Sequence, residues 1–118
     1  MLLSNVQHAY VDLAYSDDPN EIGLHWGGFV DERKSFALPV WDYPGLQRPE
    51  YIVGAEALLW SENIRSFDNA TYQMLPKAVG VWERAWNSEQ TDFNVFYSIV
   101  KKKEMPAWDA QGFDYKKR

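Results

Sequence analysis

The chain has 118 residues and a formal net charge of −5, which suits a single domain and argues against a nucleic-acid partner, because phosphate binding needs a clustered basic surface. It has no cysteine and only two histidines, so we expect no disulfide and no metal centre, and nothing indicates another cofactor. Neither a signal peptide nor an apolar run long enough to cross a bilayer is recognisable, so we expect no membrane partner, and the compartment stays open.

The first half of the chain predicts two strands separated by a long loop. Residues 2–4 and 8–13 are typical of one interrupted strand or two short ones, because β-branched and aromatic residues gather there. An irregular region rich in glycine and proline then runs to about residue 50, with one short helix expected within 31–38. Residues 51–60 are almost continuously apolar, which predicts a strand buried on both faces.

The second half predicts helices. Large apolar residues recur there at spacings of four, three and four: Leu75, Val79, Trp82 and Trp86. Ala78, Val81 and Ala85 widen this stripe, which predicts a helix that buries most of its circumference. We expect Pro76 in its first turn, or as a kink after a preceding turn that begins near Asp68.

A final helix is expected from Thr91, which would act as its N-cap with Asp92 in the first turn. The lysines at 101–103 would then complement the C-terminal end of the helix dipole. Pro106 either kinks this helix or starts a last turn that Gly112 ends.

The order of strand, long loop, strand and helices predicts an α/β fold whose two strands are parallel. Two parallel strands are only a piece of a sheet, because both outer edges and much of the apolar surface would stay in water. We therefore expect the chain to associate with further strands, either from another chain or from a copy of itself.

A candidate binding site lies at the end of the second predicted strand. Trp60 and Glu62 are two positions apart, so in an extended chain their side chains face the same side. An indole face beside a carboxylate suits a ring that is apolar on its flat side and carries hydroxyls at its rim, which describes a sugar. A buried tryptophan followed by a glutamate at a helix entrance explains the pair equally well.

Five blocks of the sequence, taken in order, resemble one family: Leu3-Ser4, Tyr10-Val11-Asp12, Gly23 with Trp26, the stretch from Gly54 to Glu62, and Pro76-Lys77-Ala78 through Trp86. The family is glycoside hydrolase family 20, the β-N-acetylhexosaminidases, and the resemblance runs from Leu2 to about Tyr115. It covers only the seventh and eighth βα units of that family's (β/α)8 TIM barrel. The resemblance thus implies that residues 1–118 are a C-terminal fragment of a catalytic domain.

The resemblance also implies roles for five residues. Tyr10 matches the tyrosine whose hydroxyl donates to the acetamido oxygen of the substrate, the group that attacks the anomeric carbon in the family's retaining, substrate-assisted reaction. Asp12 and Glu62 match carboxylates that accept from outer hydroxyls of the sugar. Trp60 matches an indole wall of the acetamido pocket, and Trp26 a tryptophan at its rim. Without the family, a strand-end pair tied to the backbone explains Tyr10 and Asp12, and a loop anchor explains Trp26.

One part of the family's machinery has no counterpart here, the Asp-Glu pair at the end of the fourth strand that supplies the general acid. The nearest substitutes do not follow an apolar strand: Asp17-Asp18, Asp31-Glu32 and Glu83. The arginine expected near the end of the family's first strand is also missing. A general acid must lie within hydrogen-bond reach of the leaving oxygen, so we expect the chain to be inactive alone.

Three functions therefore remain open from the sequence. The chain is part of a β-N-acetylhexosaminidase that acts on N-acetyl-hexosamine-containing glycans together with the remainder of the barrel, or a carbohydrate-binding element, or an inactive interaction fragment that associates with another chain or itself.

Overall fold

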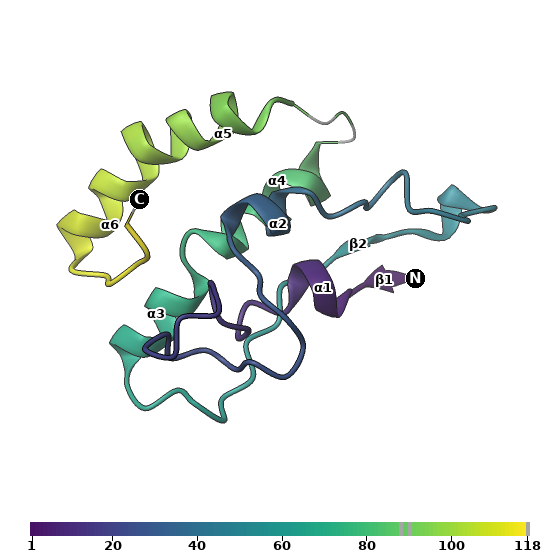
Figure 1. Cartoon of the computed structure of the whole chain (residues 1–118). Coiled ribbons are helices and arrows are strands. Elements are labelled where there is room, and N and C mark those ends of the chain that lie inside the picture. Colours follow the sequence, from purple (N-terminus) through teal and green to yellow (C-terminus); the bar gives the residue numbers. More distant parts are fainter. Residues whose placement is uncertain (88, 90, 118) are drawn as a thin grey trace.

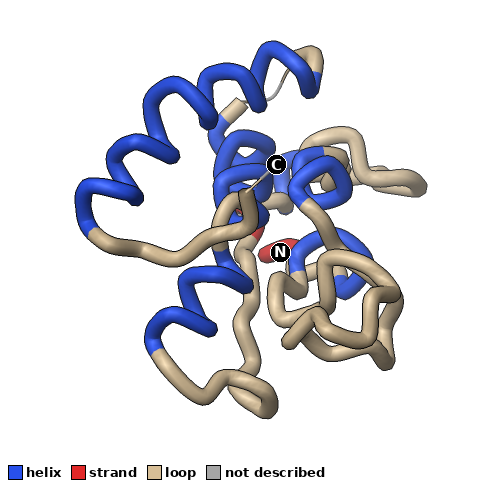
Figure 2. The backbone as a smooth tube through the Cα atoms, turned by 60° about the vertical axis from the view of Figure 1, so that its left-hand side comes forward, coloured by secondary structure: helices blue, strands red, loops and turns tan. Residues whose placement is uncertain are grey.

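The computed structural model describes residues 1–87, 89 and 91–117. It has an α/β fold in which β1 (Leu2–Leu3) and β2 (Gly54–Ala55) pair in parallel, with Leu2 opposite Gly54 and Leu3 opposite Ala55. The two strands lie side by side near the N-terminus (Figure 1), and helices and loops make up most of the remaining chain (Figure 2). The predicted parallel pair is confirmed.

The first predicted strand is only partly correct, because a short helix interrupts it. Residues 6–9 form α1 (Val6–Ala9), whose N-cap Asn5 accepts a hydrogen bond from the amide of Gln7. The chain then returns to the same edge, where Tyr10 forms an isolated parallel bridge with Leu58. The predicted strand from residue 8 is therefore wrong for residues 8 and 9, which belong to α1. The helix cap at Asn5 outweighs the β propensity of the residues that follow it.

The second predicted strand is much shorter than its apolar run, and it is not buried. A 3-10 turn, η1 (Pro49–Tyr51), precedes it, and only β2 is paired as a regular strand. Val53 is 75% exposed, and Glu56 is exposed too. Among the described residues β2 has a neighbour on one edge only, so the surface that the apolar run was expected to bury stays open.

Two helices in the middle of the molecule pack closely on each other. The expected short helix is α2 (Glu32–Phe36), and Asp31 caps it by accepting from the Lys34 amide. It lies against α4 (Lys77–Trp86) at Gly80, where an added Cβ would stand 2.8 Å from the Phe36 amide nitrogen. A glycine at this position is what lets the two backbones approach.

The predicted buried stripe of α4 is only partly correct. Ala78 and Val81 are buried as expected, together with Lys77, Gly80 and Arg84, but Trp82 and Trp86 are 49% and 87% exposed. The buried residues and the two tryptophans both recur at helical spacing. The close contact with α2 requires the side of α4 that contains Gly80, so the tryptophans remain exposed on the opposite side.

Pro76 separates two helices and does not lie within one. The turn expected near Asp68 is an eight-residue helix, α3 (Phe67–Met74), which Ser66 caps by accepting from the Asn69 amide. Pro76 occupies the N-cap position of α4. The predicted break at this proline after a preceding turn is confirmed, and Pro76 lies one position before the first turn of α4.

The last helical segment is one continuous rod, drawn in green and yellow in Figure 1. It consists of α5 (Phe93–Ile99), a π-helical stretch η2 (Val100–Glu104) and α6 (Met105–Gln111), and its N-cap is Asp92, not Thr91. Pro106 lies in the first turn of α6, and Gly112, at φ 75°, ends it as expected. The three lysines at 101–103 lie in the middle of this rod, so their predicted place at a helix end is wrong.

Two apolar clusters hold these elements together. One lies under the strand pair and includes Leu3, Leu38 and Val81, and the other joins the rod to α2 through Phe36, which stacks on Phe96 at 4.6 Å between ring centroids. No helix in the described ranges is long and apolar enough to span a membrane.

Candidate functional site

Three aromatic side chains predicted for the site converge in the structure. The Tyr10 ring centroid lies 6.5 Å from that of Trp26 and 6.4 Å from that of Trp60, with interplanar angles of 79° and 53°. Aromatic pairs at this separation are in favourable contact. Trp26 is 66% and Trp60 51% exposed, so both indoles touch Tyr10 and still present ring surface to solvent.

The backbone explains why residues from distant parts of the sequence meet here. The bridge between Tyr10 and Leu58 sets Tyr10 beside the segment that leads to Trp60 two residues later. A second parallel bridge joins Leu13 to Leu24, and Trp26 follows two residues on. Both tryptophans thus come directly after a point where the chain pairs with the 10–13 segment.

Asp12 is the buried charge of the site. Its side chain is 3% exposed, and neither carboxylate oxygen has a hydrogen-bond partner among the residues that the structure describes. Burial raises the pKa of Asp12, the negative charge of Glu62 raises it further, and the backbone amide of Asp12 and the Lys77 ammonium act in the opposite direction. Leaving a buried carboxylate without side-chain donors costs free energy.

Glu62 is exposed and lies close enough for its charge to act on Asp12. Residues 59–62 contain no helix, and the nearest helix begins at Phe67. The alternative of a buried tryptophan at a helix entrance is therefore wrong, since Trp60 is half exposed and the chain around it is irregular. Trp26 is too exposed to act as a buried loop anchor, and apart from its own amide the Asp12 carboxylate has no backbone partner in the described chain.

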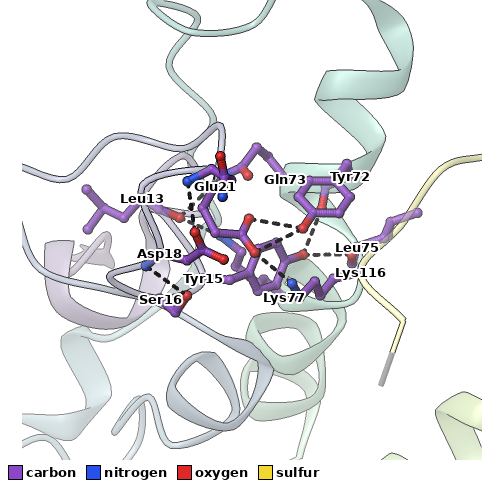
Figure 3. Close-up of polar contacts among 11 residues, drawn as sticks. Leu13, Tyr15, Ser16, Asp18, Glu21, Tyr72, Gln73, Leu75, Lys77 and Lys116 are labelled. Atoms are coloured by element: carbon purple, nitrogen blue, oxygen red, sulfur yellow. Dashed lines mark hydrogen bonds and ion pairs between the residues drawn. The ribbon is translucent and has the colours of Figure 1, made fainter.

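Sequence reasoning missed two polar residues directly behind the site. Gln73 and Lys77 are fully buried, and both donate to backbone carbonyls of the Val11 to Leu13 segment. Figure 3 shows them approaching Leu13. Their residue types do not indicate this role in the sequence, because it depends on which carbonyls the folded chain brings to them.

A second polar cluster fastens the C-terminal tail next to the site (Figure 3). Lys116 Nζ lies 2.6 Å from Glu21 Oε1, and the Tyr72 hydroxyl donates to the same carboxylate at 3.0 Å. Burial raises the pKa of Tyr72, and the hydrogen bond to Glu21 raises that of Lys116. Within the described part of the chain, no three histidine or carboxylate side chains converge in a way that could hold a metal ion.

Comparison with known proteins identifies the class. The family model described as "Glycosyl hydrolase family 20, catalytic domain" matches residues 1–89. The chain therefore belongs to glycoside hydrolase family 20, as the resemblance in the sequence implied.

Particular relatives agree with this assignment. The β-N-acetylhexosaminidase of Cellulomonas fimi is 34% identical over 115 residues, which are 96% of this chain and 23% of the relative. The solved β-N-acetylhexosaminidase of Streptomyces coelicolor superposes with a TM-score of 0.86 at 31% identity, over 99% of this chain and 24% of that one. An exo-β-N-acetylglucosaminidase of Vibrio harveyi, solved in complex with N-acetylglucosamine, superposes with a TM-score of 0.86 at 26% identity, over 98% of this chain and 18% of that one. The chain thus spans less than a quarter of the length of these relatives.

Proposed function

We propose that the chain is the C-terminal part of a β-N-acetylhexosaminidase barrel, its last two βα units, and that it supplies one wall of the sugar-binding site. The convergence of Tyr10, Trp26 and Trp60 around the end of a parallel pairing, next to the unpartnered Asp12, carries this proposal. Close superposition on 24% of one solved relative and 18% of the other supports it.

The five residues have distinct roles in the proposal. The Tyr10 hydroxyl donates to the acetamido oxygen of the substrate, orients it towards the anomeric carbon and stabilises the charge that develops on the acetamido group. Asp12 and Glu62 accept from hydroxyls at the outer rim of the sugar, and each such hydrogen bond to a charged group is worth about 1.5–3 kcal/mol. Trp60 forms the apolar wall beside the acetamido group, and Trp26 closes the rim.

We also propose that the chain alone does not hydrolyse glycosides, because none of the described residues is assigned as a general acid for the leaving oxygen. Three of the five candidates from the sequence accept hydrogen bonds from neighbouring residues, and the first is Asp18, which accepts from the Asn20 amide. Asp31 accepts from the Lys34 amide as a helix cap, and Glu83 accepts from the Asn87 side chain. The Asp12 carboxylate has no partner, but in this scheme it binds sugar hydroxyls.

The partner in this proposal is the remainder of the barrel. An apolar groove of about 470 Å³ runs between the β2 edge and the outer face of α4, and several of its residues are exposed: Leu2, Val53, Trp82 and Trp86. Strands and helices of the missing units would cover such a surface. The same groove supports the second candidate, an interaction fragment that pairs with a copy of itself.

Hydrolysis of an aryl N-acetylglucosaminide tests the proposal. We expect no chromophore release from the chain alone, and release when it is co-expressed with a polypeptide that carries the first six βα units of a family 20 barrel and their Asp-Glu pair. If the isolated chain released chromophore and Glu62→Gln abolished this release, the proposal that the general acid comes from the remainder of the barrel would be contradicted. Assembly of a stable complex without turnover would favour the interaction fragment.

A further inference from the structure

The side chains of Gln73 and Lys77 form a buried contact with the backbone that carries Tyr10 and Asp12. Gln73 lies in the last turn of α3, and Lys77 is the first residue of α4. Both side chains are fully buried. They therefore contact the site from the protein interior, on the side away from any ligand.

Three consecutive carbonyls accept hydrogen bonds from these two side chains. Gln73 Nε2 lies 3.2 Å from the carbonyl oxygen of Val11, 3.3 Å from that of Asp12 and 3.2 Å from that of Leu13. Lys77 Nζ donates to Val11 at 2.9 Å and to Leu13 at 2.6 Å. One ammonium nitrogen thus connects the Val11–Asp12 and Leu13–Ala14 peptide groups, and Gln73 holds the Asp12–Leu13 peptide group between them.

This contact replaces a strand ladder that the segment does not have. Residues 10–13 form a turn between two isolated bridges, so the carbonyls of Val11 and Leu13 have no strand neighbour to donate to them. Buried carbonyls need donors, and Gln73 and Lys77 provide them. Because the carbonyls of Val11 and Asp12 belong to the two peptide planes that flank the Asp12 Cα, fixing both sets the direction of the Asp12 side chain.

Packing alone does not explain a lysine at this position. Burial lowers the pKa of Lys77 to about 7, although the nearby carboxylates Glu21, Asp12, Glu32 and Asp31 raise it in part. The Tyr15 ring, 3.9 Å from Nζ, also faces the ammonium. A methionine of similar volume would avoid the cost of burying a cation, and apolar replacements of buried ions are often neutral or stabilising.

We propose that Lys77, assisted by Gln73, is a positioning residue for the sugar site: by holding the carbonyls of Val11 to Leu13, it sets the direction in which Tyr10 and Asp12 enter the site. The proposal rests on the proposed function above, since it assumes that Tyr10 and Asp12 bind an amino sugar. It adds that the sugar site also depends on Lys77 and Gln73, which do not themselves contact the sugar.

The test compares the sugar affinity of Lys77→Met with that of the wild-type chain. The affinity is measured on the isolated chain from the indole N–H signals of Trp26 and Trp60 during titration with N-acetylglucosamine. Arg84→Met is the matched control, because Arg84 is also a buried cation on α4 and donates to a carbonyl, that of Leu38 at 3.0 Å, away from the site. We expect Lys77→Met to weaken binding about tenfold, as loss of one charged hydrogen bond would, and Arg84→Met to change it within about twofold. The midpoint of the Asp12 carboxyl titration should rise in Lys77→Met only.

Wild-type affinity in Lys77→Met, or an equal loss in Arg84→Met, would overturn the proposal while leaving the sugar site intact. Should Lys77→Met fail to fold, Gln73→Met decides: binding weakened about threefold supports the proposal, and unchanged binding overturns it. A wild-type chain without any indole response would overturn the proposed function itself, and this inference with it.

Discussion

Exposed indoles are unusual features of the surface around Tyr10. Burying an aromatic ring is among the largest favourable terms in folding, yet Trp26 and Trp60 each leave half or more of their surface in water while touching the same tyrosine. Clustered, half-exposed aromatic residues next to a buried carboxylate are typical of a surface that a ligand covers.

Trp60→Ala should weaken binding of N-acetylglucosamine to the chain by about tenfold, because truncation of a central aromatic contact commonly costs about 1–2 kcal/mol. Wild-type binding is expected on the order of millimolar, since only part of a site is present. Calorimetric titration measures both. Trp86→Ala is the control, because Trp86 is more exposed than Trp60 and lies on the outer face of α4; an equal loss in this variant would contradict the assignment of the site.

Burial of Lys77 makes the free energy of unfolding depend on pH. Its pKa is about 7 in the folded chain and close to 10.4 in an unfolded one, so between these values the unfolded state binds more protons and the free energy of unfolding rises with pH. The slope is at most about 1.4 kcal/mol per pH unit. Tyr72 and Lys116 have raised pKa values, so they act with the opposite sign and only above about pH 10.

Urea unfolding at several pH values between about 7 and about 10 measures this slope. We expect stability to increase across the range in the wild-type chain and to stay flat in Lys77→Met. Parallel curves for the two proteins would show that Lys77 keeps an ordinary pKa, and would contradict the burial of its ammonium group.

Helix packing in the centre of the molecule depends on a close approach of α2 and α4. Gly80→Ala would raise helix propensity, but its Cβ would meet the Phe36 amide nitrogen at 2.8 Å. We expect a net loss of stability of about 1–3 kcal/mol, the usual cost of overpacking. Thermal unfolding provides the measurement.

Ala107→Gly is the control for Gly80→Ala, because Ala107 is exposed in α6 and reports helix propensity alone. It should cost up to about 1 kcal/mol. If alanine were preferred to glycine at both positions, the close contact between α2 and α4 would be wrong.

The predictability of each element depends on whether its signal is local. Asp31, Pro76 and Gly112 act on their neighbouring residues, and the helix boundaries that they indicate are close to those observed. The buried face of α4 was predictable only in part, because the apolar residues at helical spacing include both Val81, which is buried, and Trp82, which is exposed, and only the partner helix decides between them. The apolar run of residues 51–60 is longer than β2, and in the described sheet β2 pairs on one edge only, so the local pattern alone does not determine its extent.

Some site residues were also predictable from local sequence and others were not. The spacing of Trp60 and Glu62 indicated a shared face, but the approach of Tyr10 and Trp26 required the family resemblance, since parallel bridges at Leu58 and Leu24 create it. Lys77 and Gln73 gave no chemical signal in the sequence. Their function depends on which carbonyls they meet, and that is a property of the folded chain.

At the scale of the whole molecule, the chain has more apolar surface than a small isolated domain usually exposes. The groove between the β2 edge and α4 includes Trp82 and Trp86, and β2 has a neighbour on one edge only in the described sheet. Such a surface favours association, with the rest of a barrel where that is available and with another copy where it is not.

The isolated chain should therefore self-associate in a concentration-dependent way, as light scattering and sedimentation can measure. Replacing Trp82 and Trp86 together by glutamine should raise the monomer fraction, whereas Trp26→Gln, on the sugar-site side, should leave it unchanged. A wild-type chain that is monomeric at all concentrations and melts cooperatively would contradict an unpartnered apolar face.

Binding of an amino sugar against Tyr10 and Trp60 of this chain can be observed through intermolecular nuclear Overhauser effects. In a labelled chain with N-acetylglucosamine, we predict effects from the acetyl methyl protons to the Trp60 indole and the Tyr10 ring. Effects that appear only at Trp82 and Trp86, or at no aromatic residue of the chain, would contradict it.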